Sequence, residues 1–171
     1  MIVGTTTSLR EPRDADESVL AAMRNDVVMQ QLLLARPRPN SRARVQHWLA
    51  SVADDPASVL FVIADAETDE AVGFLQVREI DLLSGHGRLG IAVRTDRQRR
   101  GYARQAIELA GPYLRDVFSL RKLVLDVRAD NADAIALYDA VGFRSVGTLR
   151  GHHRVGEIYH DVVVMEKVFG E

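Results

Sequence analysis

Residues 98 to 106, QRRGYARQA, place arginines on both sides of a glycine and so form a candidate anion-binding turn. The polar stretch before Gly101 follows an apolar segment that ends at Val93, and a helical pattern begins near Gly101. The first amides of a helix have no intrahelical partners, and the helix dipole places partial positive charge at that end. Because glycine also lets a ligand approach the backbone, the segment predicts either a phosphate-binding loop or an ordinary solvated turn.

A second candidate pair, Asn131 and Tyr138, lies seven residues apart in the predicted helix NADAIALYDAVGF. This spacing puts both residues on one helix face, about 10 Å apart along the axis, and we expect that face to point toward the sheet. A tyrosine hydroxyl can donate a proton to a leaving group. The alternatives are a core aromatic for Tyr138 and a simple N-cap for Asn131.

The elements that position these residues follow from the spacing of apolar residues along the chain. Period-two and continuous apolar runs predict strands, whereas repeats of three and four predict helices. We expect strands at 5–10, 58–65, 71–81, 87–94, 122–129, 143–151 and 158–169, and helices at 18–26, 27–35, 40–52, from near 101 to 117, and at 131–143. This order predicts an α+β fold with one mixed sheet, in a single domain that covers residues 1–171.

Composition excludes several classes of protein. The chain lacks cysteine, so thiolate chemistry and disulfides are excluded, and no apolar run approaches the length that spans a bilayer. We therefore expect a cytoplasmic protein with no membrane partner. The net charge of −2 argues against a nucleic-acid partner. His152 and His153 are adjacent and should point to opposite faces of a strand, and the other histidines lack partners at ligand spacing, so we predict no metal site.

The glycine turn and the helix motif together resemble the GNAT N-acetyltransferase superfamily. The string Q-R-R-G-Y-A is similar to its Q/R-x-x-G-x-G/A motif, and the run N-x-x-A-x-x-x-Y-x-x-x-G-F follows about thirty residues later. The resemblance covers about residues 58–168 and is to the RimJ-like, spermidine and amino-sugar acetyltransferase branches. It implies a mostly antiparallel mixed sheet of about seven strands flanked by four to five helices. It also implies acetyl-CoA as cosubstrate and an acyltransferase activity.

The resemblance also assigns roles to residues of this chain. It makes Tyr138 the general acid that protonates the departing thiolate, and it places Asn131 against the cofactor arm. The backbone of three strand residues would bond the pantetheine arm, and the loop and helix start would hold the pyrophosphate. The cofactor residues implied in this way are Ile91, Ala92, Val93, Gln98, Arg99, Arg100, Gly101, Tyr102, Ala103, Arg104 and Asn131.

The chain departs from the pattern at the position of the general base. Many relatives carry glutamate at the start of the strand before the loop, where this chain has Arg88. Glu79 on the neighbouring strand is the first candidate for a base or a water-positioning group and is also a candidate substrate-binding residue, and His86 and Asp81 are second choices. For each of the three, a polar residue near a hairpin turn is an equally good interpretation.

The acceptor side is rich in arginine, which disfavours a cationic polyamine. Arg36 and Arg38 would suit the diphosphate of a nucleotide-linked amino sugar. We therefore expect a small-molecule primary amine with an anionic group as acceptor. The alternatives are the N-terminal amine of a ribosomal or other protein, a polyamine, a non-catalytic acyl-CoA-binding module and a nucleic-acid binder. A homodimer is also possible, because such domains often pair.

Overall fold

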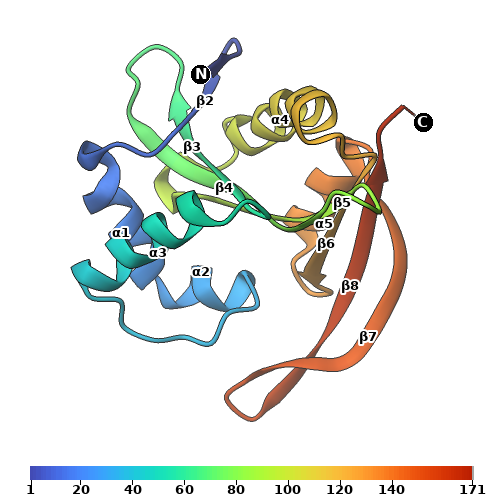
Figure 1. Ribbon diagram of the computed structural model, residues 1–171. Helices are drawn as coiled ribbons and strands as arrows, with labels where there is room; N and C mark the ends of the chain where they lie inside the picture. Colours follow the sequence, from blue (N-terminus) through green and yellow to red (C-terminus); the bar gives the residue numbers. More distant parts are fainter. Residues whose placement is uncertain (171) are drawn as a thin grey trace.

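The chain folds around one central sheet, and the computed structural model describes residues 1–170 of it (Figure 1). The strands are β1 (Ile2–Val3), β2 (Thr7–Arg10), β3 (Val59–Asp65), β4 (Ala71–Asp81), β5 (His86–Val93), β6 (Lys122–Arg128), β7 (Arg144–Val155) and β8 (Ile158–Val168). The helices are α1 (Glu17–Asn25), α2 (Val27–Leu32), α3 (Arg42–Asp54), α4 (Tyr102–Phe118) and α5 (Ala132–Ala140). Within the described residues the strand order is β1-β2-β3-β4-β5-β6-β8-β7. Neighbouring strands are antiparallel except β5 and β6, which are parallel.

Helices cover both faces of the sheet, and the alternation of side chains along β3 explains this arrangement. Leu60 and Val62 pack in a hydrophobic cluster with residues of α1 and α3, whereas Phe61 and Ile63 pack in a second cluster with residues of α4 and α5. Successive side chains of a strand point to opposite faces, so an apolar run buries both faces at once. The two clusters therefore fix α4 and α5 on the face opposite to α1 and α3.

The parallel pairing of β5 with β6 is short. It runs only from His86 opposite Lys122 to Arg88 opposite Val124. Beyond this point β5 stays paired with β4 as far as Val93, and β6 stays paired with β8 as far as Arg128. In the described chain, residues 89–93 and 125–128 thus face each other without a hydrogen-bond ladder. Buried backbone amides and carbonyls need partners, so this opening is suited to a ligand that bonds to main chain.

Local signals fix the helices that border the opening. The Asn131 side chain accepts a hydrogen bond from the Ala134 amide (3.3 Å) and caps α5, and Gly142 with φ 90° follows the end of that helix. Gly101 precedes α4 with φ 85°, a left-handed conformation that glycine adopts readily. The turn chemistry of the sequence therefore sets where both helices begin.

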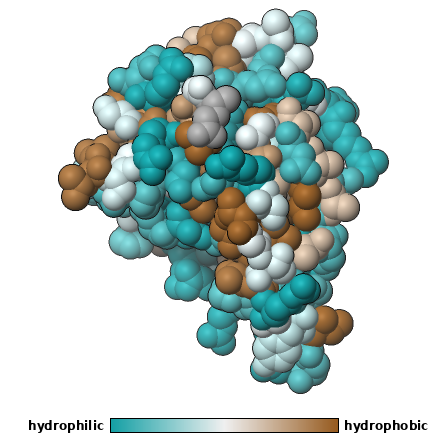
Figure 2. All heavy atoms as spheres, turned by 90° about the vertical axis from the view of Figure 1, so that its right-hand side faces the viewer, coloured by the Kyte–Doolittle hydropathy of each residue, from teal (hydrophilic) through white to brown (hydrophobic). Residues whose placement is uncertain are grey.

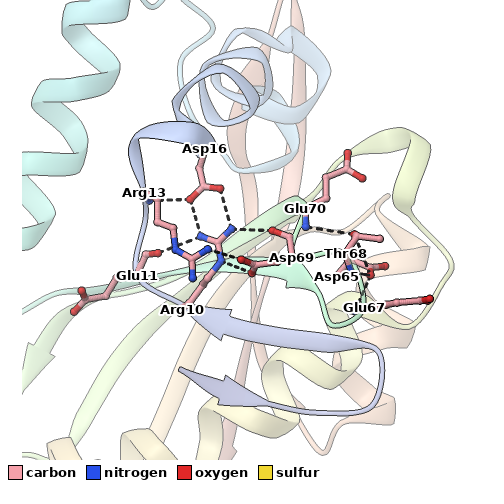
Figure 3. A network of polar contacts seen from close by, with 9 residues as sticks. All are labelled: Arg10, Glu11, Arg13, Asp16, Asp65, Glu67, Thr68, Asp69 and Glu70. Atoms are coloured by element: carbon pink, nitrogen blue, oxygen red, sulfur yellow. Dashed lines mark hydrogen bonds and ion pairs between the residues drawn. The ribbon is translucent and has the colours of Figure 1, made fainter.

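An ion-pair network around the buried Arg10 joins the N-terminal segment to the turn between β3 and β4 (Figure 3). The Arg10 guanidinium donates to both carboxylate oxygens of Asp16 (2.7 and 3.0 Å), and both side chains are 5% exposed. Arg10 also donates to Asp69 (2.8 Å), to which Arg13 donates as well. These bonds raise the pKa of Arg10 and lower the pKa of Asp69. The network holds the turn before α1 against the sheet.

Strand β7 forms the exposed edge of the sheet, and its hairpin with β8 extends beyond the other strands (Figure 1). Val146, Leu149 and Ile158 of this hairpin are largely exposed. Figure 2 views the molecule from this side and shows apolar atoms among mostly hydrophilic ones. A second copy of the chain could cover such a surface, and the homodimer stays a prediction.

The α+β class and the mostly antiparallel sheet are confirmed, with local differences. The expected strands correspond to β2 to β8, and β1 adds a two-residue strand that no hydrophobic pattern indicated. Helix α2 ends at Leu32 rather than residue 35, and Leu34 takes φ 57° just after it. No helix within residues 1–170 has the length and apolarity to cross a bilayer.

We predict that Asp16→Ala destabilises the fold by about 3 kcal/mol, because it leaves the buried Arg10 guanidinium without its main partner. Asp14→Ala is the matched control, since Asp14 lies in the same 3-10 turn and is exposed. Urea unfolding followed by circular dichroism measures both. Equal midpoints for the two variants would show that the pair contributes little.

Candidate active site

A cavity of about 870 Å³ fills the opening between β5 and β6. Strand residues 88–93 and 125–127 form its central walls, and the loop before α4 closes one end. Asn131 and Tyr138 border it from α5 and its N-cap, and residues of α2 and of the β7–β8 hairpin border it as well. The sheet opening thus becomes a pocket that segments distant in the sequence complete.

The predicted cofactor residues gather around this cavity. Ten of the eleven line it, and Arg100 does not. The Gln98 side chain donates to the Val93 carbonyl (3.0 Å) and holds the loop against the end of β5. At Gly101, the position of an added Cβ has open space around it. A ligand can therefore approach the first amides of α4, whose dipole favours an anion.

Carboxylates of the turn between β3 and β4 hold the loop from outside the cavity. Glu70 accepts hydrogen bonds from Arg94 (2.6 Å) and Arg97, and Asp65 accepts one from the Tyr102 hydroxyl. These bonds raise the pKa values of Arg94 and Tyr102. Arg94 and Arg97 are thus neutralised by the protein itself, while Arg99 and Arg104 line the cavity beside the first amides of α4.

Tyr138 lies in the cavity wall and in the hydrophobic core at once. The side chain is 8% exposed and packs against Phe143, with ring centroids 5.6 Å apart. Burial raises the pKa of the Tyr138 hydroxyl to about 12, so it carries its proton at neutral pH. The hydroxyl makes no hydrogen bond with any of residues 1–170 and is available to donate.

The structure places the candidate bases, on β4 and at the start of β5, outside the cavity wall. Arg88 lines the cavity and pairs with Asp126, and its Nε lies 3.6 Å from a carboxylate oxygen of Glu79. Glu79 itself is 63% exposed and sits with φ 53° where the β4–β5 register shifts. Asp81 accepts hydrogen bonds within its turn and lies 3.9 Å from His86. None of Glu79, Asp81 and His86 lines the cavity.

Arg36 and Arg38 line a second cavity of about 290 Å³ rather than the main one. Arg24 of α1 contributes to the same wall, and Leu33 lines both cavities. The predicted acceptor arginines therefore lie next to the main cavity but not in it.

Two residues without a predicted role, His152 and His153, line the main cavity. That they point to opposite faces of a strand stays a prediction, and the strand is irregular here, because the β7–β8 register shifts between Leu149 and His153 and Gly151 has φ 53°. Such a bulge re-aims the side chains next to it. Gly151 is the one sequence signal that could have indicated it.

The start of α4, which favours an anion, the opened edge of the sheet and the buried Tyr138 thus meet in one cavity. The chain belongs to the acetyltransferase (GNAT) domain family, whose model matches residues 7–144. The expected enzyme class is thereby confirmed at the level of the family.

The chain is similar in sequence to characterised N-acetyltransferases. The chain is 30% identical to the spermidine N(1)-acetyltransferase of Vibrio cholerae over 63% of this chain and 62% of that protein. It is 33% identical to the ribosomal protein bS18 alanine N-acetyltransferase of Salmonella typhimurium, over 68% of each. The chain thus spans just under two thirds of the spermidine enzyme's length.

The solved structures of relatives show the fold. Vibrio cholerae spermidine N-acetyltransferase in complex with CoA and spermine superposes with a TM-score of 0.89 at 24% identity, over 96% of each chain. The expected GNAT fold is therefore confirmed over nearly the whole chain.

We predict that Gly101→Ala weakens CoA binding about tenfold, equivalent to about 1.4 kcal/mol, because the methyl group enters the approach to the α4 amides. Gly156→Ala is the matched control. It has φ 60° and open space around its Cβ position, so it carries similar strain in the β7–β8 turn. Calorimetric titration with CoA compares the two, and a wild-type affinity for Gly101→Ala would contradict this account of the loop.

Proposed function

We propose that this protein is an acetyl-CoA-dependent N-acetyltransferase that moves an acetyl group to a primary amine by direct attack. One observation carries the proposal: Tyr138 lines the same cavity as the unpaired edge of β5 and the start of α4. A proton donor, a track of main-chain groups and an anion site thus share one pocket. This is the set that a long phosphate-bearing thioester requires.

The residues present fit that cosubstrate. The backbone of Ile91, Ala92 and Val93 lacks a partner strand on the β6 side within the described chain, so it can bond the pantetheine arm. The open backbone around Gly101 and the first amides of α4 can hold the pyrophosphate. Asn131 caps α5 and also lines the cavity, so it can stabilise the helix and contact the pantetheine arm at the same time.

Acetyl transfer from a thioester to an amine requires two proton transfers. The amine nitrogen forms a bond to the acetyl carbon while the carbon–sulfur bond breaks. The amine gives up one proton to a base, and Tyr138 donates one to the leaving sulfur. Because burial raises the pKa of Tyr138 to about 12, the hydroxyl regains a proton readily at neutral pH. Arg88 forms ion pairs with Asp126 and Glu79, and these pairs stabilise the cavity wall.

We predict that Tyr138→Phe lowers kcat about a hundredfold while CoA binding stays unchanged, because only the proton donor is removed. Acetyl transfer is measured by release of the CoA thiol, and CoA affinity by calorimetry. Tyr113→Phe, a change to another tyrosine packed on the core, is the control. If wild-type protein bound CoA but acetylated no amine in a broad panel, the chain would be the non-catalytic acyl-CoA module instead.

The second cavity supports an acceptor with an anionic group, such as a nucleotide-linked amino sugar. Arg24, Arg36 and Arg38 line it, and none of them forms an ion pair within residues 1–170. Burial lowers the pKa of Arg24, and the charges of Arg38 and Arg44 lower it further. Positive charges gathered without counterions favour an anion, and arginine forks suit a diphosphate.

The loop that carries these arginines is fixed. Gln30 bonds both the amide (2.8 Å) and the carbonyl (3.2 Å) of Arg38, and the Asn40 side chain donates to the Arg24 carbonyl (2.7 Å). An anion would thus meet a preorganised site. Because Leu33 lines both cavities, a phosphate held there lies beside the place where the amine reacts.

The alternatives are a polyamine and a protein N-terminus, which the names of the relatives support. The carboxylates that line the main cavity are engaged, however. Asp26 caps α2 by accepting from the Met29 amide (3.0 Å), and Asp126 and Asp133 pair with Arg88 and Arg99. A polycation would have to displace these partners, which favours the anionic acceptor.

We predict that the double variant Arg36→Gln, Arg38→Gln raises KM for a nucleotide-linked 4-amino sugar at least tenfold and leaves KM for acetyl-CoA unchanged. Arg115→Gln, on the far part of α4, is the control. An acceptor screen across amino sugars, their nucleotide conjugates, polyamines and peptides supplies the rates. An unchanged acceptor KM, or a preference for polyamines, would exclude the anionic acceptor.

A further inference from the structure

We propose that Asp126 is the carboxylate that binds the attacking amine and takes its proton, an inference that rests on the proposed acetyl transfer. Asp126 lies on β6 and lines the main cavity, whereas the three candidate bases predicted from the sequence do not. The cavity therefore has a carboxylate of its own, supplied by the strand across the opening from Arg88.

Asp126 stands at the fork where β5 and β6 separate. The last parallel pair joins Arg88 to Val124, and Asp126 is the next residue of β6 on the same face. The loop before α4 closes the opposite end of the opening, after Val93. A ligand that holds its phosphate groups at α4 and extends along β5 therefore brings its far end, the thioester, to the fork.

Asp126 and Tyr138 lie on opposite faces of this opening. Leu125 and Val127, the neighbours of Asp126, are buried in the hydrophobic cluster that contains Tyr138 and residues of α4. Successive side chains of a strand alternate between faces, so Asp126 points to the other face, where Arg88 meets it. A proton acceptor and a proton donor thus approach the thioester from two sides.

The second cavity lies on the same face as Asp126. Arg88 and Ala92 are an even number of residues apart on β5 and so share a face. Ala92 belongs to one hydrophobic cluster with Met23 and Phe74, which line the second cavity. An acceptor that binds there by its anionic group presents its amine on the face of Asp126, while the sulfur leaves toward the other face.

Arg88 holds Asp126 and leaves one carboxylate oxygen open. The guanidinium donates to Oδ2, whereas Oδ1 makes no hydrogen bond within residues 1–170. The side chain is 27% exposed, and Oδ1 is not one of the buried unpartnered atoms of this part of the chain. Because a carboxylate can accept several hydrogen bonds, a single amine can bond to Oδ1 while Arg88 stays in place.

The transfer then balances in bonds and protons. The amine nitrogen gains positive charge as it bonds to the acetyl carbon, and Asp126 stabilises that charge and takes the proton on Oδ1. The carbon–sulfur bond breaks, and the Tyr138 hydroxyl gives its proton to the sulfur. Asp126 then returns its proton to water, and Tyr138 regains one from water.

Two other carboxylates line the cavity, and each has another use. Asp133 is 82% exposed and pairs with Arg99 of the glycine loop (2.9 Å), at the phosphate end of the opening. Asp26 caps α2 by accepting from the Met29 amide. Asp26→Asn is therefore the rival variant in the test.

The test compares Asp126→Asn with Glu166→Gln. Both variants break an ion pair that involves β6, but Glu166 and its partner Lys122 lie outside the cavity wall. With the best amine of the acceptor screen, we expect Asp126→Asn to lower kcat about a hundredfold and Glu166→Gln to keep the wild-type value. Calorimetry should show unchanged CoA affinity for both variants.

Two further measurements separate a catalytic role from a structural one. Formate should restore part of the rate of Asp126→Ala, because a small carboxylate can enter the vacated space, and chloride at equal ionic strength should not. Calorimetric titration of the same amine into CoA-loaded protein involves no turnover, and we expect about tenfold weaker binding in Asp126→Asn only.

The assignment is overturned if Asp126→Asn keeps the wild-type kcat, if formate has no effect on Asp126→Ala, or if Asp26→Asn alone loses the activity. Failure of the proposed function looks different, because then wild-type protein acetylates no amine and Tyr138→Phe changes nothing.

Discussion

The separation of β5 from β6 after three paired residues is the constraint on which the site depends. Each strand keeps its outer partner, so the sheet stays intact while two inner edges are left facing a cavity. Main-chain amides and carbonyls on these edges need hydrogen-bond partners, and a ligand supplies what a strand would otherwise supply. Because the pocket is made by strand geometry, side chains around it are free to vary. Recognition of the cosubstrate therefore needs few specific side chains.

The turn between β3 and β4 gives this arrangement its rigidity. Asp65 binds the first residue of α4, Asp69 binds Arg10, and Glu70 binds Arg94 and Arg97. One short turn thus connects the N-terminal segment to the glycine loop, and Figure 3 shows its contacts with the N-terminal segment. These carboxylates pair with Arg94 and Arg97, whereas Arg99 and Arg104 pair with Asp133 and Glu108. The candidate anion site therefore combines the first amides of α4 with the cavity-lining Arg99 and Arg104.

Sequence patterns predicted the features that depend on local chemistry. The apolar runs and caps located the strands and helices, and the motif around Gly101 located the loop, because these signals act within a few residues. The position of Glu79 outside the cavity wall, of Arg36 and Arg38 in a neighbouring cavity, and of His153 in the main one depends on register shifts and on packing between distant segments. A one-residue register shift changes the face of the sheet on which a side chain lies. The spacing of apolar residues in the sequence does not indicate such a shift.

The β7–β8 hairpin extends past the core, and none of residues 149–160 of the described chain belongs to either hydrophobic cluster. Mutations in this segment therefore cost little folding free energy, since surface changes away from packed groups are usually mild. The same segment lines the acceptor end of the cavity. Substitutions can therefore accumulate in this segment during evolution without loss of the fold. Acceptor preference can change in this way, whereas the strands β5 and β6 are constrained by their pairing in the sheet.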